Sequence, residues 1–268
     1  MKKRIWILAA ALFLTGCLPG SDPVSFGTME DRGFGQYEVP PTFAPRTVVL
    51  VGLGDSLTQG VGDDRKREGY VGRLAVKMEE WKGVKGVVVH NLAKRGRRSD
   101  QLAEQLSDPR VRETIAEADI LTLTIGGNDL MKVVKEDLFS LDAKAFEGKL
   151  EPFMDRLSTS LFQVRRANPD AVLIVLGLYN PLTVVTDEES EFDGILSDWN
   201  AVLEDAAVAD GRACYVPVDD LFITNRDLVY HTDFFHPNGK GYSRMTDRIM
   251  DALSRCGLNR LSGGELEF

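Results

Sequence analysis

The sequence predicts an α/β fold in which a parallel five-stranded sheet lies between two layers of helices. Apolar runs typical of strands alternate five times with amphipathic segments typical of helices, and such alternation implies crossover connections that cover both faces of a sheet. Several runs are continuously apolar, as expected for strands buried on both faces. Clusters of polar residues follow the strands directly, where such sheets form their sites.

The expected elements follow one another along a single domain, residues 47–268, whose length suits one core. The expected strands are Val48–Val51, Val87–Val89, Ile120–Ile125, Ala171–Leu176 and Ala213–Val218. The expected helices, in which apolar residues recur at helical spacing, include Tyr70–Trp81, Leu150–Val164, Leu196–Leu203 and Tyr242–Leu253. The second of these helices should end at Asn168-Pro169, because proline cannot continue a helix.

The N-terminus predicts an export signal. Met1–Arg4 is basic and Ile5–Leu14 is apolar, but this stretch is shorter than the ~20 residues that a membrane-spanning helix needs. The following Thr15-Gly16-Cys17 resembles the lipobox of bacterial lipoproteins, in which the cysteine is lipidated and becomes the new N-terminus. The alternative is an ordinary signal peptide with an incidental cysteine. We expect residues 1–16 to be a lipoprotein signal peptide and Cys17 to anchor the protein to a membrane outside the cytoplasm.

Residues 17–46 are expected to form a tether, because five prolines are interspersed there with glycines, serines and acidic residues. Removal of residues 1–16 would change the formal net charge from -9 to -12, since the signal contains three basic residues and no acidic ones. This acidic balance argues against a nucleic-acid partner and against broad electrostatic adhesion to anionic lipid.

Ser56 lies at the end of the first expected strand, in Gly54-Asp55-Ser56-Leu57. A serine held between a strand end and the next helix presents its hydroxyl as a nucleophile, with its own N–H beside it. The alternative is that Ser56 only caps the helix. A dinucleotide-binding loop is excluded, because Leu57 stands where a third glycine is needed and Asp55 would repel a pyrophosphate. The nucleophile elbow of α/β-hydrolases fits poorly, because Thr58 replaces its last glycine.

Four polar clusters are expected at the same edge of the sheet. They are Ser56, Asn91–Gly96, Gly126–Asp129 and Asp233–Asn238. A serine, a glycine-flanked asparagine and an Asp-x-x-His pair supply the nucleophile, oxyanion donor, base and base-orienting acid of acyl transfer.

At these residues the sequence resembles the SGNH hydrolases, or GDSL-type esterases and lipases. The matching motifs are Gly54-Asp55-Ser56-Leu57, Gly96, Gly126-Gly127-Asn128-Asp129 and Asp233-Phe234-Phe235-His236, in the order that the family has them. The resemblance implies a flavodoxin-like three-layer α/β/α sandwich. It also implies an active site with Ser56 as nucleophile, His236 as base and Asp233 as the partner of His236. The Ser56 and Gly96 N–H groups and the Asn128 amide would form the oxyanion hole.

Other polar residues have simpler interpretations. We expect His231 to be a rim residue and His90 a satisfied core histidine, and with three histidines in the chain we expect no metal site and no cofactor. Asp55 and Asp129 are expected to be caps and loop braces. Asn128 itself has an alternative as a plain turn residue.

Lys94, Arg95, Arg97 and Arg98 crowd Gly96, which is where this chain departs most clearly from the family pattern. Such a run is usually a solvated loop. The alternative is that Arg97 or Arg98 binds an anionic leaving group, such as a phospholipid headgroup, beside the oxyanion hole.

Cys214 and Cys256 could pair in an exported protein, but a buried thiol is ordinary in a strand, and we expect both to be free. The segments Leu130–Leu141 and Tyr179–Gly194 follow strands at the site edge and are expected to shape the acyl pocket.

Three functions remain open from the sequence. The preferred one is a serine acylhydrolase that cleaves esters or thioesters of lipids or other small acyl substrates. The second is a carbohydrate O-deacetylase acting on cell-wall polymers, which would use the same catalytic groups. The third is a lipoprotein that binds such ligands without turning them over.

Overall fold

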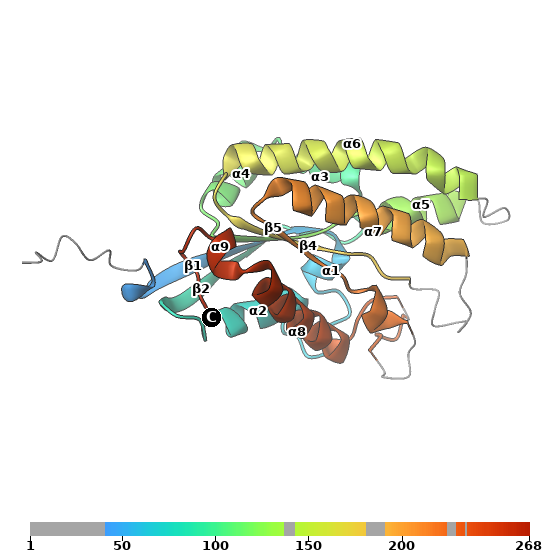
Figure 1. Ribbon diagram of the computed structural model, residues 1–268. Coiled ribbons are helices and arrows are strands. Elements are labelled where there is room, and N and C mark those ends of the chain that lie inside the picture. The colour runs from blue at the N-terminus through green and yellow to red at the C-terminus, as the bar shows by residue number, and fades with distance from the viewer. Residues whose placement is uncertain (1–40, 137–142, 181–190, 224–228, 234) are drawn as a thin grey trace, which may run out of the picture. The chain divides into compact units, whose positions relative to one another are not determined.

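The computed structural model describes residues 41–136, 143–180, 191–223, 229–233 and 235–268 (Figure 1). The expected signal peptide, Cys17 and most of the expected tether lie outside the described residues. Pro40–Phe268 form one compact unit. Within the described residues, no helix combines the length and the apolar character needed to cross a membrane.

The described residues contain one parallel sheet in the order β2-β1-β3-β4-β5. Its strands are β1 (Arg46–Gly54), β2 (Val84–Asn91), β3 (Ile120–Thr124), β4 (Val172–Leu176) and β5 (Ala213–Val216). Each expected strand is present, and the α/β sandwich predicted from the sequence is confirmed. In this order β1 and β3 are neighbours, so the chain segments that leave their carboxyl ends start side by side.

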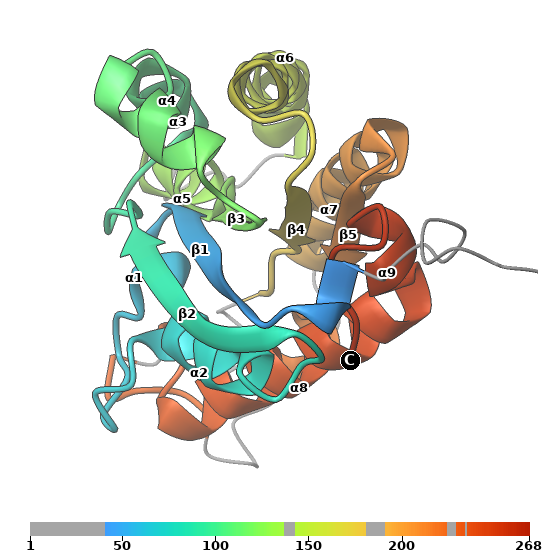
Figure 2. The ribbon, with the colours of Figure 1, turned by 90° about the vertical axis from the view of Figure 1, so that its left-hand side faces the viewer.

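Helices cover both faces of the sheet (Figures 1 and 2). They are α1 (Ser56–Gln59), α2 (Gly69–Met78), α3 (Ser99–Gln105), α4 (Pro109–Ala116), α5 (Gly127–Glu136), α6 (Ala143–Ala167), α7 (Glu191–Asp210), α8 (Gly239–Cys256) and α9 (Leu258–Leu261), with 3₁₀ turns η2 (Pro41–Phe43) and η4 (Asp219–Phe222). Figure 2 shows α2 and α8 on one face and α3 to α7 on the other.

The core consists of two apolar clusters, one on each face of the sheet. Successive strand residues alternate between them. Leu50 belongs to the cluster with α2 and α8, whereas Val51 belongs to the cluster with α6 and α7. The inner strands β3 and β4 and most of β1 are therefore buried on both faces, which explains their continuously apolar sequences, whereas β2 is only partly buried.

Two details of the expected elements are wrong. Trp81 is buried, but it lies beyond α2, which ends at Met78; the left-handed Gly83 (φ 71°) then turns the chain into β2. His90 is only half-buried, because β2 is an edge strand of the sheet, where side chains are covered less completely than on an inner strand.

Cys214 and Cys256 form a disulfide, with their Cα atoms 5.9 Å apart, so the expectation of two free thiols is wrong. The last residue of α8 packs back onto β5, and this tertiary contact brings together two cysteines separated by 42 positions. The closed loop contains Asp233 and His236.

Candidate active site

Ser56 is the first residue of α1, immediately after β1. Gly54 makes this exit possible, because its φ is +115° and a Cβ there would lie 1.9 Å from the Thr124 carbonyl oxygen. Asp55 caps α1 by accepting the Leu57 N–H at 3.0 Å, as expected for that residue. Ser56 is therefore not the cap, and its hydroxyl remains available for another contact.

The Ser56 hydroxyl contacts His236, which lies 180 residues further along the chain. Ser56 Oγ is 2.9 Å from His236 Nε2, and His236 Nδ1 is 2.6 Å from Asp233 Oδ2. A carboxylate at Nδ1 selects the tautomer with the proton on that nitrogen. Nε2 is then the acceptor, and the serine hydroxyl donates to it. Both the serine and the histidine are buried.

The carboxylate of Asp233 contacts both the imidazole ring and the backbone of His236. Its Oδ1 accepts the N–H groups of Phe235 at 3.1 Å and His236 at 2.9 Å. Partial burial alone would raise the pKa of Asp233, but these bonds and the bond to the imidazole outweigh it and lower that pKa to about 2. The carboxylate is therefore ionised at neutral pH.

The segment that carries the histidine is a short hairpin. The N–H of His231 donates to the His236 carbonyl at 2.8 Å, and the N–H of Asn238 donates to the Val229 carbonyl at 2.8 Å. The hydroxyl of Tyr179, which follows β4, donates to the Phe235 carbonyl at 2.6 Å. His231 itself is half-exposed at the rim, with Nδ1 3.9 Å from Asp233 Oδ1, as expected.

Asn128 lies in the first turn of α5, directly after β3. The segment Gly126–Asp129 thus begins a helix and is not a plain turn. The amide of Asn128 donates to the Arg97 carbonyl at 3.0 Å, which leaves its second N–H for another acceptor. Asn128 and Ser56 line the same pocket. The Ser56 N–H has no acceptor within its own helix, because it belongs to the first turn.

Asp129 braces the turn that faces Asn128. It accepts the Ser99 hydroxyl at 2.6 Å and the Ser99 N–H at 2.9 Å, and Arg156 of α6 lies 3.6 Å away. Burial raises the pKa of Asp129 despite these partners. This structural role agrees with the expectation from the sequence.

Gly96 is exposed and occupies the third position of the turn Lys94–Arg97, with φ +78°. It lines a surface hollow of about 710 Å³ beside α3 and α4, and it is not among the residues that line the Ser56 pocket. Its role as a third oxyanion donor stays a prediction.

Arg97 and Arg98 have protein partners and do not line the Ser56 pocket. Arg97 Nη1 donates to the carbonyls of Leu92 at 2.8 Å and Gly54 at 3.4 Å, and Arg98 pairs with Asp100 at 2.9 Å. The alternative that Arg97 or Arg98 binds an anionic leaving group stays a prediction. The carbonyl groups of the two strand exits hold Arg97 inward.

The pocket beside Ser56 has about 40 Å³ of free space. Its apolar lining comprises Leu57, Leu130, Met131, Leu178, Tyr179, Phe192, Leu196 and Phe235. Four of these residues fall in the segments expected to form an acyl pocket, although 137–142 and 181–190 lie outside the described residues. Leu196 was expected only as part of a helix, and the sequence analysis assigned no role to Leu178. The position of Leu178 just after a strand was the signal for its role.

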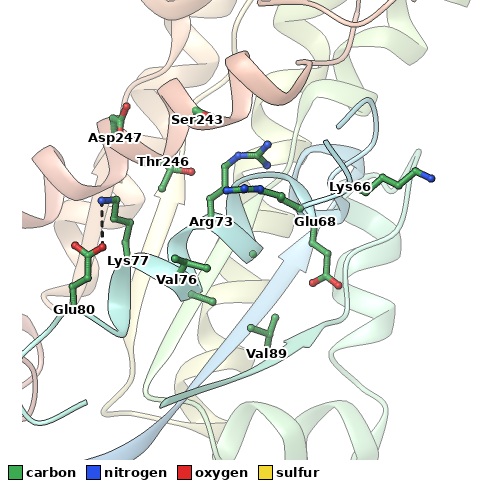
Figure 3. Close-up of a pocket in the computed structure, with 13 residues that line it drawn as sticks. Lys66, Glu68, Arg73, Val76, Lys77, Glu80, Val89, Ser243, Thr246 and Asp247 are labelled. Atoms are coloured by element: carbon green, nitrogen blue, oxygen red, sulfur yellow. Dashed lines mark ion pairs between the residues drawn. The ribbon is translucent and has the colours of Figure 1, made fainter. Parts of the chain in front are cut away.

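A larger hollow of about 590 Å³ lies between α2 and α8 (Figure 3). Its lining mixes basic residues such as Lys66 with acidic ones such as Asp247, and it contains none of the residues of the Ser56 site. We place the active site at the smaller pocket because the groups for chemistry are there. Within the described part of the chain, no cluster of three or more His, Cys, Asp or Glu residues could hold a metal ion.

Comparisons with known proteins agree with this geometry. Residues 53–244 match the GDSL-like lipase/acylhydrolase family. The chain is 37% identical to the uncharacterized protein YpmR of Bacillus subtilis, over 96% of this chain and 99% of that protein. It is 29% identical to the spore germination lipase LipC of Bacillus licheniformis, over 81% and 100% of the two chains.

Among solved structures, the lipase Lip_vut3 from a goat rumen metagenome superposes with a TM-score of 0.69 at 26% identity, and the match covers 80% of this chain and 99% of that one. The fold, the family match and the arrangement around Ser56 lead to the same assignment: this chain is a member of the GDSL-like lipase/acylhydrolase family, whose enzymes are serine ester hydrolases.

Proposed function

We propose that the protein hydrolyses carboxylic esters through an acyl-enzyme on Ser56. The observation that carries the proposal is the continuous contact from Ser56 Oγ through His236 to Asp233, with distances of 2.9 and 2.6 Å. Such a chain lets a neutral imidazole accept the serine proton while the carboxylate stabilises the imidazolium that forms.

The reaction proceeds in two halves. Ser56 Oγ forms a bond to the ester carbonyl carbon as its proton moves to His236 Nε2. The tetrahedral intermediate then expels the alcohol, which takes that proton. Water, deprotonated by the same nitrogen, attacks the acyl-enzyme, and the acid leaves as Ser56 regains its proton. The Ser56 N–H and the second N–H of Asn128 would stabilise the oxyanion in both halves.

The apolar lining supports an acyl group as the part of the substrate that enters the pocket. The relationship to the lipase LipC supports lipid esters among the substrates. Thioesters react by the same steps and belong to the same proposal. The same catalytic groups would serve O-deacetylation of wall polymers, which stays the second candidate.

We also propose that the enzyme acts outside the cytoplasm, anchored through Cys17. The support is the sequence of the N-terminus, with its basic start, short apolar stretch and lipobox-like cysteine. Cys17→Ser should release the protein from the membrane fraction and abolish incorporation of labelled fatty acid. Unchanged retention and labelling of the variant would contradict this proposal.

A fluorophosphonate probe tests the chemistry directly. We expect stoichiometric labelling of the wild type and none of Ser56→Ala, while the exposed Ser254→Ala in α8 labels normally. Labelling that persists in Ser56→Ala would overturn the assignment and leave the third function, ligand binding without turnover. A panel of p-nitrophenyl esters of increasing chain length, run beside acetylated glycans, separates the two enzymatic candidates.

A further inference from the structure

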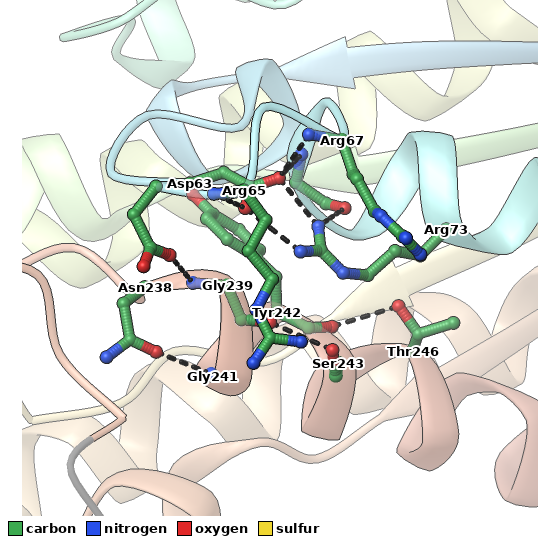
Figure 4. Close-up of polar contacts among 12 residues, drawn as sticks. Asp63, Arg65, Arg67, Arg73, Asn238, Gly239, Gly241, Tyr242, Ser243 and Thr246 are labelled. Atoms are coloured by element: carbon green, nitrogen blue, oxygen red, sulfur yellow. Dashed lines mark hydrogen bonds and ion pairs between the residues drawn. The ribbon is translucent and has the colours of Figure 1, made fainter.

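Outside the catalytic groups, the clearest polar construction lies in the loop that joins α1 to α2, residues 60–68 (Figure 4). Asp63 in this loop and Arg73 in α2 form a bidentate ion pair, with distances of 2.6 and 2.9 Å. Their side chains are only 2% and 8% exposed. A buried pair of this kind needs further hydrogen bonds to offset its desolvation.

Asp63 obtains those bonds from the loop itself. It accepts the N–H groups of Arg65 at 3.2 Å, Arg67 at 2.9 Å and Gly69 at 3.0 Å. Burial alone would raise the pKa of Asp63, but Arg73 and the N–H groups of Gly69 and Arg67 lower it below its usual range. The carboxylate is thus ionised and determines the path of the loop.

The same loop contains two non-glycine residues in the left-handed conformation, Lys66 (φ 51°) and Glu68 (φ 56°). Such residues persist only where the surrounding contacts force them, and they cluster at functional sites. Neither residue lines the Ser56 pocket, so the strained backbone does not serve substrate binding there directly. The segments against which the loop packs therefore indicate its role.

The loop packs directly against the segment that carries His236. At Gly62 (φ +91°) an added Cβ would lie 2.9 Å from His236 Cβ and 2.6 Å from the Pro237 carbonyl oxygen. Asp64 Oδ1 accepts the Gly239 N–H at 2.7 Å, at the start of α8. The Tyr242 hydroxyl of α8 donates to the Val61 carbonyl at 2.6 Å.

We propose that the Asp63–Arg73 pair holds the loop of residues 60–68 in one conformation, and that this loop positions the catalytic base, His236. Gly62 sets how closely the loop can approach His236 and Pro237. The proposal rests on the proposed role of His236. None of these residues touches the reacting atoms, so each is a positioning residue. Displacement of a catalytic group by about 1 Å can lower the rate about a hundredfold, and a rigid loop packed against His236 would prevent such a displacement.

Gly62→Ala tests the contact between the loop and His236, since the added methyl must push the His236 segment away. We expect kcat to fall about 10- to 100-fold while KM stays within about twofold, because the atoms that the added methyl would meet belong to His231, His236 and Pro237, none of which lines the pocket. The matched control is Gly264→Ala, where φ is +92° but no atom lies within 4 Å of the added Cβ. This control carries the same backbone strain and should keep the wild-type kcat.

Tyr242→Phe provides a milder variant in case Gly62→Ala does not fold. It removes only the hydroxyl that joins α8 to the loop, and we expect a several-fold loss of kcat at unchanged KM. Thr246→Val is its control, because that hydroxyl bonds within α8, to the Tyr242 carbonyl at 2.9 Å. Equal kcat values for Tyr242→Phe, Thr246→Val and the wild type would overturn the proposal.

The proposed function and the positioning proposal can fail separately. Full activity in His236→Ala would contradict the proposed function. If His236→Ala is inactive while Gly62→Ala matches Gly264→Ala in kcat, the histidine is the base but the loop does not position it. Kinetics on these three variants with p-nitrophenyl acetate, together with thermal melts to confirm folding, decide between the outcomes.

Discussion

The two halves of the site are built in different ways. Ser56 and Asn128 leave the ends of the neighbouring strands β1 and β3, where Gly54 pairs with Thr124 in the sheet. His236 lies instead in a hairpin before α8, held by Tyr179 and by the loop of residues 60–68. Sheet pairing thus sets the distance between the proposed nucleophile and the proposed oxyanion donor, whereas loop contacts set the distance to the proposed base. We expect the base half to be the more sensitive to changes in contacts remote from the pocket.

The nucleophile half is also the more buried. Asp55 accepts the Thr124 hydroxyl at 2.7 Å, and Thr124 contacts Thr58, which in turn lies 2.5 Å from the Tyr70 hydroxyl. Burial raises the pKa of Asp55 to about 6, although its hydrogen bonds from the Thr124 hydroxyl and the Leu57 N–H oppose this shift. Asp233 in the other half is partly exposed, and its pKa is lowered to about 2. The two acids therefore affect stability with opposite signs.

We expect the largest loss of kcat when the catalytic base is removed, which tests whether the two halves of the site act together. His236→Ala should lower kcat by about 10⁴-fold or more, because no other group in the proposed mechanism accepts the serine proton. His231→Ala should change kcat less than about threefold, since His231 lies at the rim. Comparable losses in the two variants would mean that the base has been misassigned.

We expect the disulfide to contribute to the free energy of unfolding and not to kcat. It closes a loop of 42 positions that includes the hairpin, and loss of this cross-link should reduce the free energy of unfolding by about 4 kcal/mol. Cys214→Ser/Cys256→Ser should therefore unfold at lower denaturant but keep kcat at 25 °C. Denaturant titration with and without reductant measures the effect. Superimposed curves would show that the bond contributes nothing.

Asn128→Ala tests the oxyanion donor of the nucleophile half. We expect kcat to fall about 10²- to 10³-fold with KM nearly unchanged, because the lost N–H acts on charge that develops during the reaction. Asn259→Ala, at an exposed position of α9, is the control. Hydrolysis of p-nitrophenyl acetate at the wild-type rate by Asn128→Ala would remove this residue from the mechanism.

Asp55→Asn tests the cost of the buried acid. The folded chain releases this proton near pH 6 and the unfolded chain near pH 3.8, so Asp55 favours folding most below pH 3.8 and loses that contribution as the pH rises through 6. At pH 7.5 the variant should therefore be more stable by about 2 to 3 kcal/mol, because asparagine mimics the protonated acid. The advantage should vanish near pH 3.5. An advantage independent of pH would point to a different cause.

The sequence predicted the features that depend on local patterns. The five strands follow from continuous apolar runs, and Ser56, Asn128 and Asp233-x-x-His236 follow from polar residues placed after strands and from the family motifs. The approach of His236 to Ser56 across 180 positions was predictable because the carboxyl ends of parallel strands share one edge.

The features that the sequence did not predict depend on tertiary packing. Pairing of Cys214 with Cys256 required the end of α8 to return to β5. The inward orientation of Arg97 depends on carbonyl groups from two strand exits. The only sequence feature that pointed to the contact between Gly62 and His236 is the pair of glycines, Gly60 and Gly62, that follows α1. A glycine does not by itself indicate which residue packs against it.

The central claim is that Ser56 becomes acylated during turnover. The most direct measurement is mass spectrometry of peptides from enzyme quenched within the first turnovers of p-nitrophenyl acetate. We expect an acetyl group on the Ser56 peptide of the wild type, a far slower accumulation in His236→Ala and none in Ser56→Ala. Acetylation of a different residue, or steady hydrolysis by Ser56→Ala at the wild-type rate, would contradict that claim.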